Sequence, residues 1–181
     1  MLAVVAIFAL LAAFVAPNLG IVSTRRLQHQ AERISAQLEL ARQRSVVTGV
    51  PHRLAIDLDH GSYWLEWFVT EAEATGQPEP PVVLDLRGSA PIPMAPTRQA
   101  ERGFRPLPSV FGHASTLESP LLFQAVETPS GSVDRGEAFV VFERDGTASP
   151  TEIVLSDGDG HALALEVLTL AEAVRIRDVE I

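Results

Sequence analysis

Apolar residues recur with two different periods along the chain. Up to residue 48 the spacing is that of a helix, and beyond it apolar and polar residues alternate every two residues. The first 24 residues carry no charge, and as a helix they would reach about 36 Å, enough to cross a hydrocarbon core of about 30 Å. Pro17 and Gly20 predict a kink or a locally melted turn in this helix. The pattern therefore predicts a transmembrane segment in residues 1–24, and its membrane-spanning side chains include Met1, Val5, Phe8, Leu11, Phe14 and Val15.

The helical pattern continues through residues 25–48 as an amphipathic segment. Apolar side chains recur there at spacings of four and three residues, which places them on one face of a helix. Gly49 and Pro51 then predict the end of the helix, because glycine favours the C-terminal cap and proline cannot continue the helix. The stripe is expected to pack the helix against the rest of the protein, and it consists of Leu27, Ala31, Ile34, Leu38 and Ala41.

Residues 49–181 alternate between apolar and polar positions, which predicts a β-rich head. Loops are expected at 70–81, 87–109 and 128–136, where proline, glycine and charged residues interrupt the pattern. The strands at 138–142, 151–155 and 161–167 are expected to form an antiparallel meander. Further strands are expected at 54–58, 63–69, 82–86, 121–126 and 174–181. The predicted fold is α+β, one long N-terminal helix packed on antiparallel β-sheet.

Composition and charge narrow the function classes. The chain has 181 residues and no cysteine, which excludes disulfides and thiolate chemistry. Its net charge of −9 is divided unevenly, because residues 25–48 hold five arginines and two glutamates whereas nine arginines and 21 acids follow. An acidic head is poorly suited to binding nucleic acid, which depends largely on neutralising phosphates. The charge suits an extracytoplasmic domain better.

Candidate chemical sites are few. Asp157 and Asp159 have a spacing found in metal loops, but the glycines between and after them equally mark a hairpin turn, which we favour. The five histidines show no ligand spacing, no serine lies in a nucleophile-elbow motif, and no glycine-rich phosphate loop is present. Trp64 and Trp67 are three residues apart in a strand and should face opposite sides. We therefore expect no catalytic residue, cofactor or metal, and a protein that is not an enzyme.

Several stretches resemble type IV pilin-like proteins. These are the apolar run, the Pro-Asn-Leu-Gly sequence at 17–20 and the amphipathic continuation through Gln43. The head is similar to the H-type minor pseudopilins of the type II secretion system (the GspH/FimT family). The stretches that carry this similarity are the helix end at 41–51, the turn at 59–63 and the sequence at 141–149. The motif residues in that last stretch are Phe142, Asp145, Gly146, Thr147 and Ser149. The middle of the chain, 70–135, is unmatched.

The resemblance implies a structural role in protein secretion across the outer membrane. Such subunits sit in the inner membrane by a single span with a methylated N-terminus and a periplasmic head. They then join a filament, the pseudopilus, whose core is the bundled helices. The implied domains are 1–24 for the membrane half of the helix, 25–48 for its amphipathic half and 49–181 for the head. The implied partners are I-, J- and K-type tip subunits, the G-type major subunit and membrane lipid.

Two alternatives remain open. The family also includes FimT-like minor pilins of type IV pili, which serve pilus assembly or DNA uptake. Arg175 and Arg177 share one face of the last strand and resemble the basic C-terminal strand with which some of these pilins contact DNA, although an exposed polar face beside acidic residues is the favoured interpretation. A membrane-tethered periplasmic enzyme is the other alternative, and the sequence offers no site for it.

The family pattern also predicts residues upstream of Met1. Family members begin their mature chain with a methylated Phe and a Glu four residues later, after a short basic leader that ends in Gly. The pattern places Met1 immediately after that Glu. A basic leader would also reconcile a periplasmic head with Arg25 and Arg26, which alone would favour a cytoplasmic one. Reading the coding sequence upstream tests this expectation, and the lack of an in-frame Gly-Phe-Thr-Leu-x-Glu there would contradict it.

Overall fold

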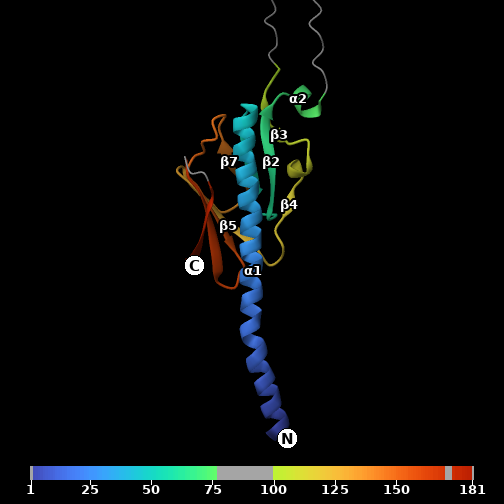
Figure 1. The fold of residues 1–181 in the computed structure, drawn as a ribbon, viewed down its shortest axis with the longest axis vertical. Helices are drawn as coiled ribbons and strands as arrows, with labels where there is room; N and C mark the ends of the chain where they lie inside the picture. Colours follow the sequence, from blue (N-terminus) through green and yellow to red (C-terminus); the bar gives the residue numbers. More distant parts are fainter. Residues whose placement is uncertain (1, 77–99, 170–172, 181) are drawn as a thin grey trace, which may run out of the picture.

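The computed structural model describes residues 2–76, 100–169 and 173–180, with the side chains of residues 2–23 and 180 left out of the description. Helix α1 runs from Leu2 to Thr48 and, at 47 residues, is about 70 Å long. Its N-terminal part extends well beyond the head (Figure 1). The helix passes through positions 17–20 without interruption, so the locally melted turn is absent, whereas a bend at Pro17 stays a prediction.

The end of α1 follows from the residues that close it. Gly49 adopts a φ of +64°, and its N–H donates to the carbonyl of Ser45 at 3.0 Å. Glycine reaches this left-handed conformation without the steric penalty of a Cβ atom. The predicted cap is therefore present, and it turns the chain directly into the first strand.

The head contains two antiparallel sheets, here called sheet A and sheet B. Sheet A has the strand order β3-β2-β1-β7, with β4 also paired to β2. Its strands are β1 (His52–Asp57), β2 (Ser62–Val69), β3 (Gly103–Pro106), β4 (Ser115–Thr116) and β7 (Glu137–Phe142). Sheet B has the order β10-β9-β8-β5-β6. Its strands are β5 (Leu122–Thr128), β6 (Gly131–Val133), β8 (Thr151–Ser156), β9 (His161–Val167) and β10 (Arg175–Glu180).

The second half of α1 packs against both sheets. It contacts β1 and β7 of sheet A and β8 and β9 of sheet B, and Figure 1 shows strands of the head on both sides of the helix. The core between these elements is apolar, and the two sheets also meet directly where Tyr63 and Phe123 make an edge-to-face contact at 6.1 Å between centroids. The predicted α+β architecture, a long helix packed on antiparallel β-sheet, is confirmed, and the strands divide into two sheets.

The predicted meander is wrong in one strand. β8, β9 and β10 form an antiparallel meander, but β7 pairs with β1 in the other sheet. The chain therefore leaves sheet B after β6 and returns to it at β8. Local alternation marks 138–142 as a strand, but it cannot specify a partner about 85 residues earlier in the chain.

Three predicted loops contain regular structure. Residues 70–81 include helix α2 (Glu71–Thr75), which a capping box between Thr70 and Glu73 opens. Residues 87–109 include β3, whose register along β2 places Phe104 opposite Phe68. Residues 128–136 include β6, and a single helical turn, η1 (Val110–Gly112), follows β3. Strands this short form because a neighbouring strand supplies their hydrogen bonds. The predicted strand at 82–86 lies outside the described residues.

Replacement of one residue of the helix stripe is expected to destabilise the whole head. Leu38 is fully buried, so Leu38→Ala should lower the free energy of unfolding by about 2–5 kcal/mol through lost burial and a residual cavity. Val47, on the same helix but 85% exposed, provides the control, and Val47→Ala should change stability by less than about 0.5 kcal/mol. Urea denaturation of the full chain measures both, and equal effects would contradict this view of the core.

Candidate assembly surfaces

The two halves of α1 differ in what surrounds them. All five residues of the predicted stripe are at most 1% exposed, so one face of the second half is completely covered by the head. The flanking positions Arg25, Gln28, Glu32 and Gln43 are exposed. The predicted membrane-spanning residues, Met1, Val5, Phe8, Leu11, Phe14 and Val15, lie outside the described side chains. Among the residues whose side chains are described, no helical stretch has the length and apolarity that a membrane crossing requires.

The C-terminal end of α1 presents an apolar surface. Val46 is 53% exposed and Val47 is 85% exposed, although both are β-branched aliphatic residues. The β7–β8 connection borders them, because a Cβ atom on Gly146 would lie 2.7 Å from Cγ2 of Val46. Gly146 also has a φ of +81°, so both its conformation and this close approach require glycine.

The predicted family motif forms this connection. Phe142 is buried in the core, and Asp145 accepts hydrogen bonds from the hydroxyl of Thr147 at 2.7 Å and from its backbone N–H at 3.0 Å. These bonds hold the pKa of Asp145 below its ordinary value. The carbonyl of Ser149 accepts from the hydroxyl of Thr151 at 3.0 Å. The motif residues therefore shape the turn that docks on the end of α1.

The outer face of sheet A carries an aromatic cluster that sequence reasoning missed. The guanidinium of Arg53 lies 3.8 Å from the ring centre of Phe139 and 4.1 Å from that of Phe104. Glu66 pairs with Arg53 at 2.6 Å and accepts from the indole N–H of Trp64 at 2.9 Å. Arg53 and Glu66 are directly opposite across β1 and β2. The alternation of charged residues along β1 and β2 could have predicted the pair of Arg53 with Glu66. The aromatic partners of Arg53 could not be predicted in this way, because they come from β3 and β7.

The two tryptophans face opposite sides of β2, as their spacing predicts. Trp64 lies on the outer face with Glu66, whereas Trp67 packs against the core, where its buried indole N–H has no hydrogen-bond partner. Its ring centre is 6.4 Å from that of His52. Burial lowers the pKa of His52. This effect is larger than that of the hydrogen bond between its Nδ1 and the carbonyl of Val50, which raises the pKa. This histidine is part of the packed interior.

The segment 157–160 forms the predicted hairpin turn between β8 and β9. Gly158 and Gly160 adopt φ angles of +76° and +99°. The buried carboxylate of Asp157 accepts from the backbone N–H groups of Asp159 and His161 at 2.8 and 3.2 Å, and its second oxygen lies 3.0 Å from Nδ1 of His161. Within the described ranges, no three histidine or acidic side chains gather closely enough to hold a metal ion.

The two arginines of β10 differ in their partners. Arg177 donates to Glu166 at 2.6 Å and to Glu152 at 2.7 Å, and these interactions raise its pKa. Glu152 and Glu166 lie opposite each other on β8 and β9, so Arg177 offsets the repulsion between two like charges. Arg175 is exposed. A DNA contact would therefore have to compete with two carboxylates for Arg177.

Among known proteins, the similarity found is to solved structures and not to sequences. No family model and no curated protein matches the sequence. Two solved structures of the minor pseudopilin EpsH from the type 2 secretion system of Vibrio cholerae are similar, at 9% and 10% sequence identity. Each has a TM-score of 0.49, and each alignment covers 86% of this chain and 97% of the solved chain.

The Asp157 turn gives a prediction of pH dependence. Burial would raise the pKa of Asp157, but the hydrogen bonds from Asp159 and His161 together lower it. A pKa below the unfolded value of about 3.9 means that the ionised carboxylate stabilises the fold above about pH 4 and ceases to do so as the pH falls through the folded pKa. Asp157→Asn should therefore destabilise the head by about 1 kcal/mol at pH 7, and the difference should shrink toward pH 3.

The matched control for this turn is Asp134→Asn, which alters an exposed aspartate in the β6–β7 connection. Denaturant midpoints of the full chain, measured across this pH range, should show little effect of the control. A penalty for Asp157→Asn that stays constant from pH 7 to pH 3 would show that the turn does not depend on the ionised form.

Proposed function

We propose that this protein is a minor pseudopilin of the H type, an assembly subunit of a type II secretion pseudopilus that serves protein export across the outer membrane. The observation that carries the proposal is the division of α1 into two halves. The half from Leu27 onward is fixed in the head by a buried apolar stripe, and the half before Thr24 extends beyond the head as an uncharged, apolar sequence.

A helix divided in this way suits both lipid and a filament core. Its backbone hydrogen bonds are satisfied internally, so the apolar half is stable in hydrocarbon. The same half can later pack against equivalent helices, because its side chains need only an apolar environment. The buried stripe keeps the head rigidly attached during this transfer. The working divisions are residues 1–24 in the inner membrane, 25–48 joining the membrane to the head, and 49–181 as the periplasmic head.

The polar residues that the sequence singles out for chemistry support an assembly role in place of catalysis. Asp157 and His161 organise a turn, and Arg177 pairs with two carboxylates within sheet B. The exposed valines at the end of α1 and the aromatic cluster on sheet A are the surfaces best suited to other subunits, since aromatic and arginine side chains are enriched in protein interfaces. The partners are I-, J- and K-type tip subunits and the G-type major subunit.

Association in the membrane tests the proposal directly. The full chain should be recovered from detergent-solubilised inner membranes together with the I-, J- and K-type subunits of its own system. Leu11→Arg places a charge in the middle of the apolar run, at about 2.5–3.5 kcal/mol on an insertion scale, and should greatly reduce both membrane insertion and this association. Arg175→Gln, a change at the exposed surface of the head, should leave both unaffected.

The same preparation separates the alternative function. Recovery of none of these subunits would contradict the proposal. Salt-sensitive retention of DNA by the full chain, lost on substitution of Arg175 and Arg177 by alanine, would instead favour a DNA-binding minor pilin. The engagement of Arg177 by two carboxylates is the reason to expect no such retention.

A further inference from the structure

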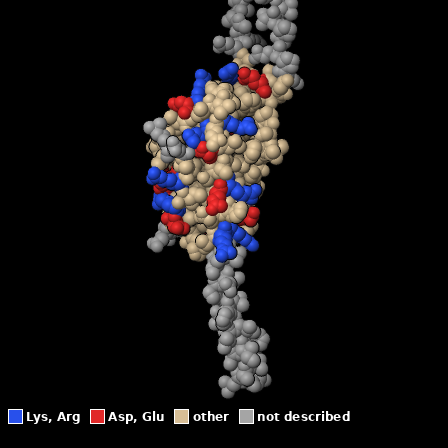
Figure 2. All heavy atoms as spheres, in the orientation of Figure 1, with Lys and Arg blue, Asp and Glu red and all other residues tan. Residues whose placement is uncertain are grey.

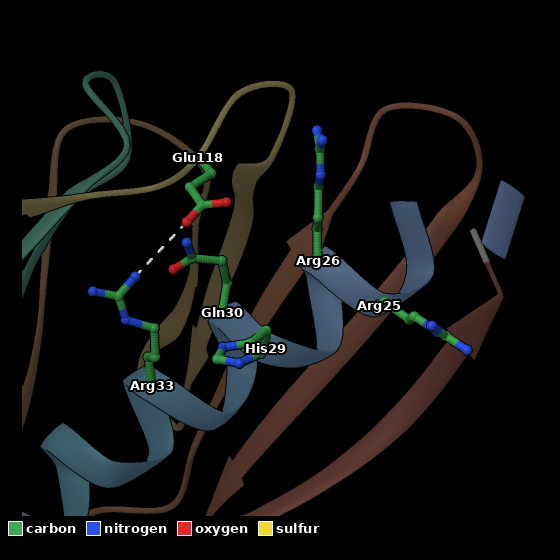
Figure 3. A pocket seen from close by; sticks show the side chains of 6 residues that line it. All are labelled: Arg25, Arg26, His29, Gln30, Arg33 and Glu118. Carbon is green, nitrogen blue, oxygen red and sulfur yellow. Dashed lines mark ion pairs between the residues drawn. The ribbon is translucent and has the colours of Figure 1, made fainter. Parts of the chain in front are cut away.

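A hollow of about 500 Å³ lies where α1 emerges from the head. One wall is the helix between residues 25 and 33, and the opposite wall is the connection before β5 (Figure 3). It is lined by Arg25, Arg26, His29, Gln30, Arg33 and Glu118. Figure 2 shows arginine side chains gathered at this end of the head, beside the protruding part of the helix. No role described above uses this site.

The lining is strongly basic. The lining holds three arginines and a single carboxylate, that of Glu118, which gives it a net charge of +2 with His29 neutral. The only ion pair among these residues joins Arg33 and Glu118 at 3.8 Å, and both side chains are more than half exposed. Such a pair is weak and exchanges readily with solvent ions. In the part of the chain that the structure describes, Arg25 and Arg26 have no acidic partner, so the site has unneutralised positive charge available.

Gln30 provides an independent observation that points to a ligand at this place. The residue is only 2% exposed, yet its Oε1 has no hydrogen-bond partner. Buried side-chain oxygens nearly always accept a hydrogen bond, and leaving one unpaired is unfavourable. In Figure 3 the amide projects from the helix into the space between Arg33 and Glu118. The hollow thus offers cations for an anion and one acceptor for a donor.

The position of the hollow identifies the source of such a group. Arg25 and Arg26 immediately follow the 24 uncharged residues. With these residues in the membrane, as proposed above, the arginines lie at the level of the lipid headgroups, and on this point the inference rests on the proposed function. Arg26 and Arg33 are seven residues apart, or about 10 Å along the helix, with Gln30 between them. A phosphate and the polar group attached to it can span that distance.

We propose that the hollow binds the headgroup of an anionic phospholipid with a free hydroxyl, of the phosphatidylglycerol type. Arg26 holds the phosphodiester, a glycerol hydroxyl donates to Oε1 of Gln30, and Arg33 adds its positive charge at the far end of the headgroup. Arg25 and His29 flank the site, and Arg25 adds to the attraction. The net charge of the lining favours an anionic headgroup over a zwitterionic one. Such a contact would set the depth and rotation of the helix in the bilayer before the subunit leaves it.

Lipid retention by the full chain tests this proposal without requiring a bilayer. The chain is held in neutral detergent micelles and titrated with phosphatidylglycerol, phosphatidylethanolamine or phosphatidylcholine, and native mass spectrometry counts the lipids retained. We expect phosphatidylglycerol to be retained in preference to the other two lipids. Arg26→Gln with Arg33→Gln should weaken retention about 25-fold, at about fivefold for each arginine. Gln30→Leu should reduce the preference over phosphatidylcholine while leaving the head folded.

The matched control is Arg144→Gln with Arg175→Gln, which removes the same charge from exposed positions on the turn after β7 and on β10. It should retain phosphatidylglycerol as the unaltered chain does. Equal weakening by the control, equal retention of phosphatidylcholine, or a preference for phosphatidylethanolamine would each overturn the proposal. Displacement of the lipid by about 10 mM inorganic phosphate would show a free-phosphate site instead.

The outcome is separable from that of the proposed function. Co-recovery of the other pseudopilins without a phosphatidylglycerol preference would overturn the lipid site alone. A lipid preference without co-recovery would overturn the assembly role and leave the site in place.

Discussion

Burial of the helix stripe between two sheets holds the helix and the head together as one folded unit. Leu27, Ala31, Ile34, Leu38 and Ala41 are essentially inaccessible to solvent, and they contact strands of both sheet A and sheet B. The small residues Ala31 and Ala41 let the helix approach the strands closely, and the larger ones fill the space between the sheets. Since no described part of the head lies beside the first half of α1 (Figure 1), the packing of this stripe fixes the direction of the protruding helix.

The two ends of this packed segment have different surroundings. At the C-terminal end, the Gly146 turn rests on Val46, and exposed valines continue the apolar surface. At the other end, the helix leaves the head through an arginine-lined hollow with an unpaired amide oxygen at Gln30. The apolar middle holds the fold together, whereas each end leaves side chains exposed at the surface. This division is the basis for the proposal that one end contacts lipid and that other surfaces contact protein neighbours.

Charge within the head is largely organised by its strands. Arg53 is held between two aromatic rings and paired with Glu66, and Arg177 joins Glu152 and Glu166 across three strands of sheet B. These arginines are therefore less available to outside anions than Arg25 and Arg26, which have no acidic partner among the described residues. The same residue type thus has a structural use in the sheets and a proposed binding use in the hollow beside α1.

Several features of this protein can be predicted from the local hydrophobic period of its amino acids. These are the helix and its buried stripe, the cap at Gly49, and strands such as β1, β8 and β9, whose apolar side chains alternate. Other features depend on a partner that is distant in the chain, and they could be seen only in the folded protein. β3 and β6 form because neighbouring strands hydrogen-bond to them, and β7 belongs to sheet A because β1 lies beside it. Arg177 likewise finds its partners 11 and 25 residues away in the chain. Folding also brings Gln30 and Glu118 together in one hollow. The physical reason is that periodicity reports which side of an element is buried, whereas only packing specifies what covers it.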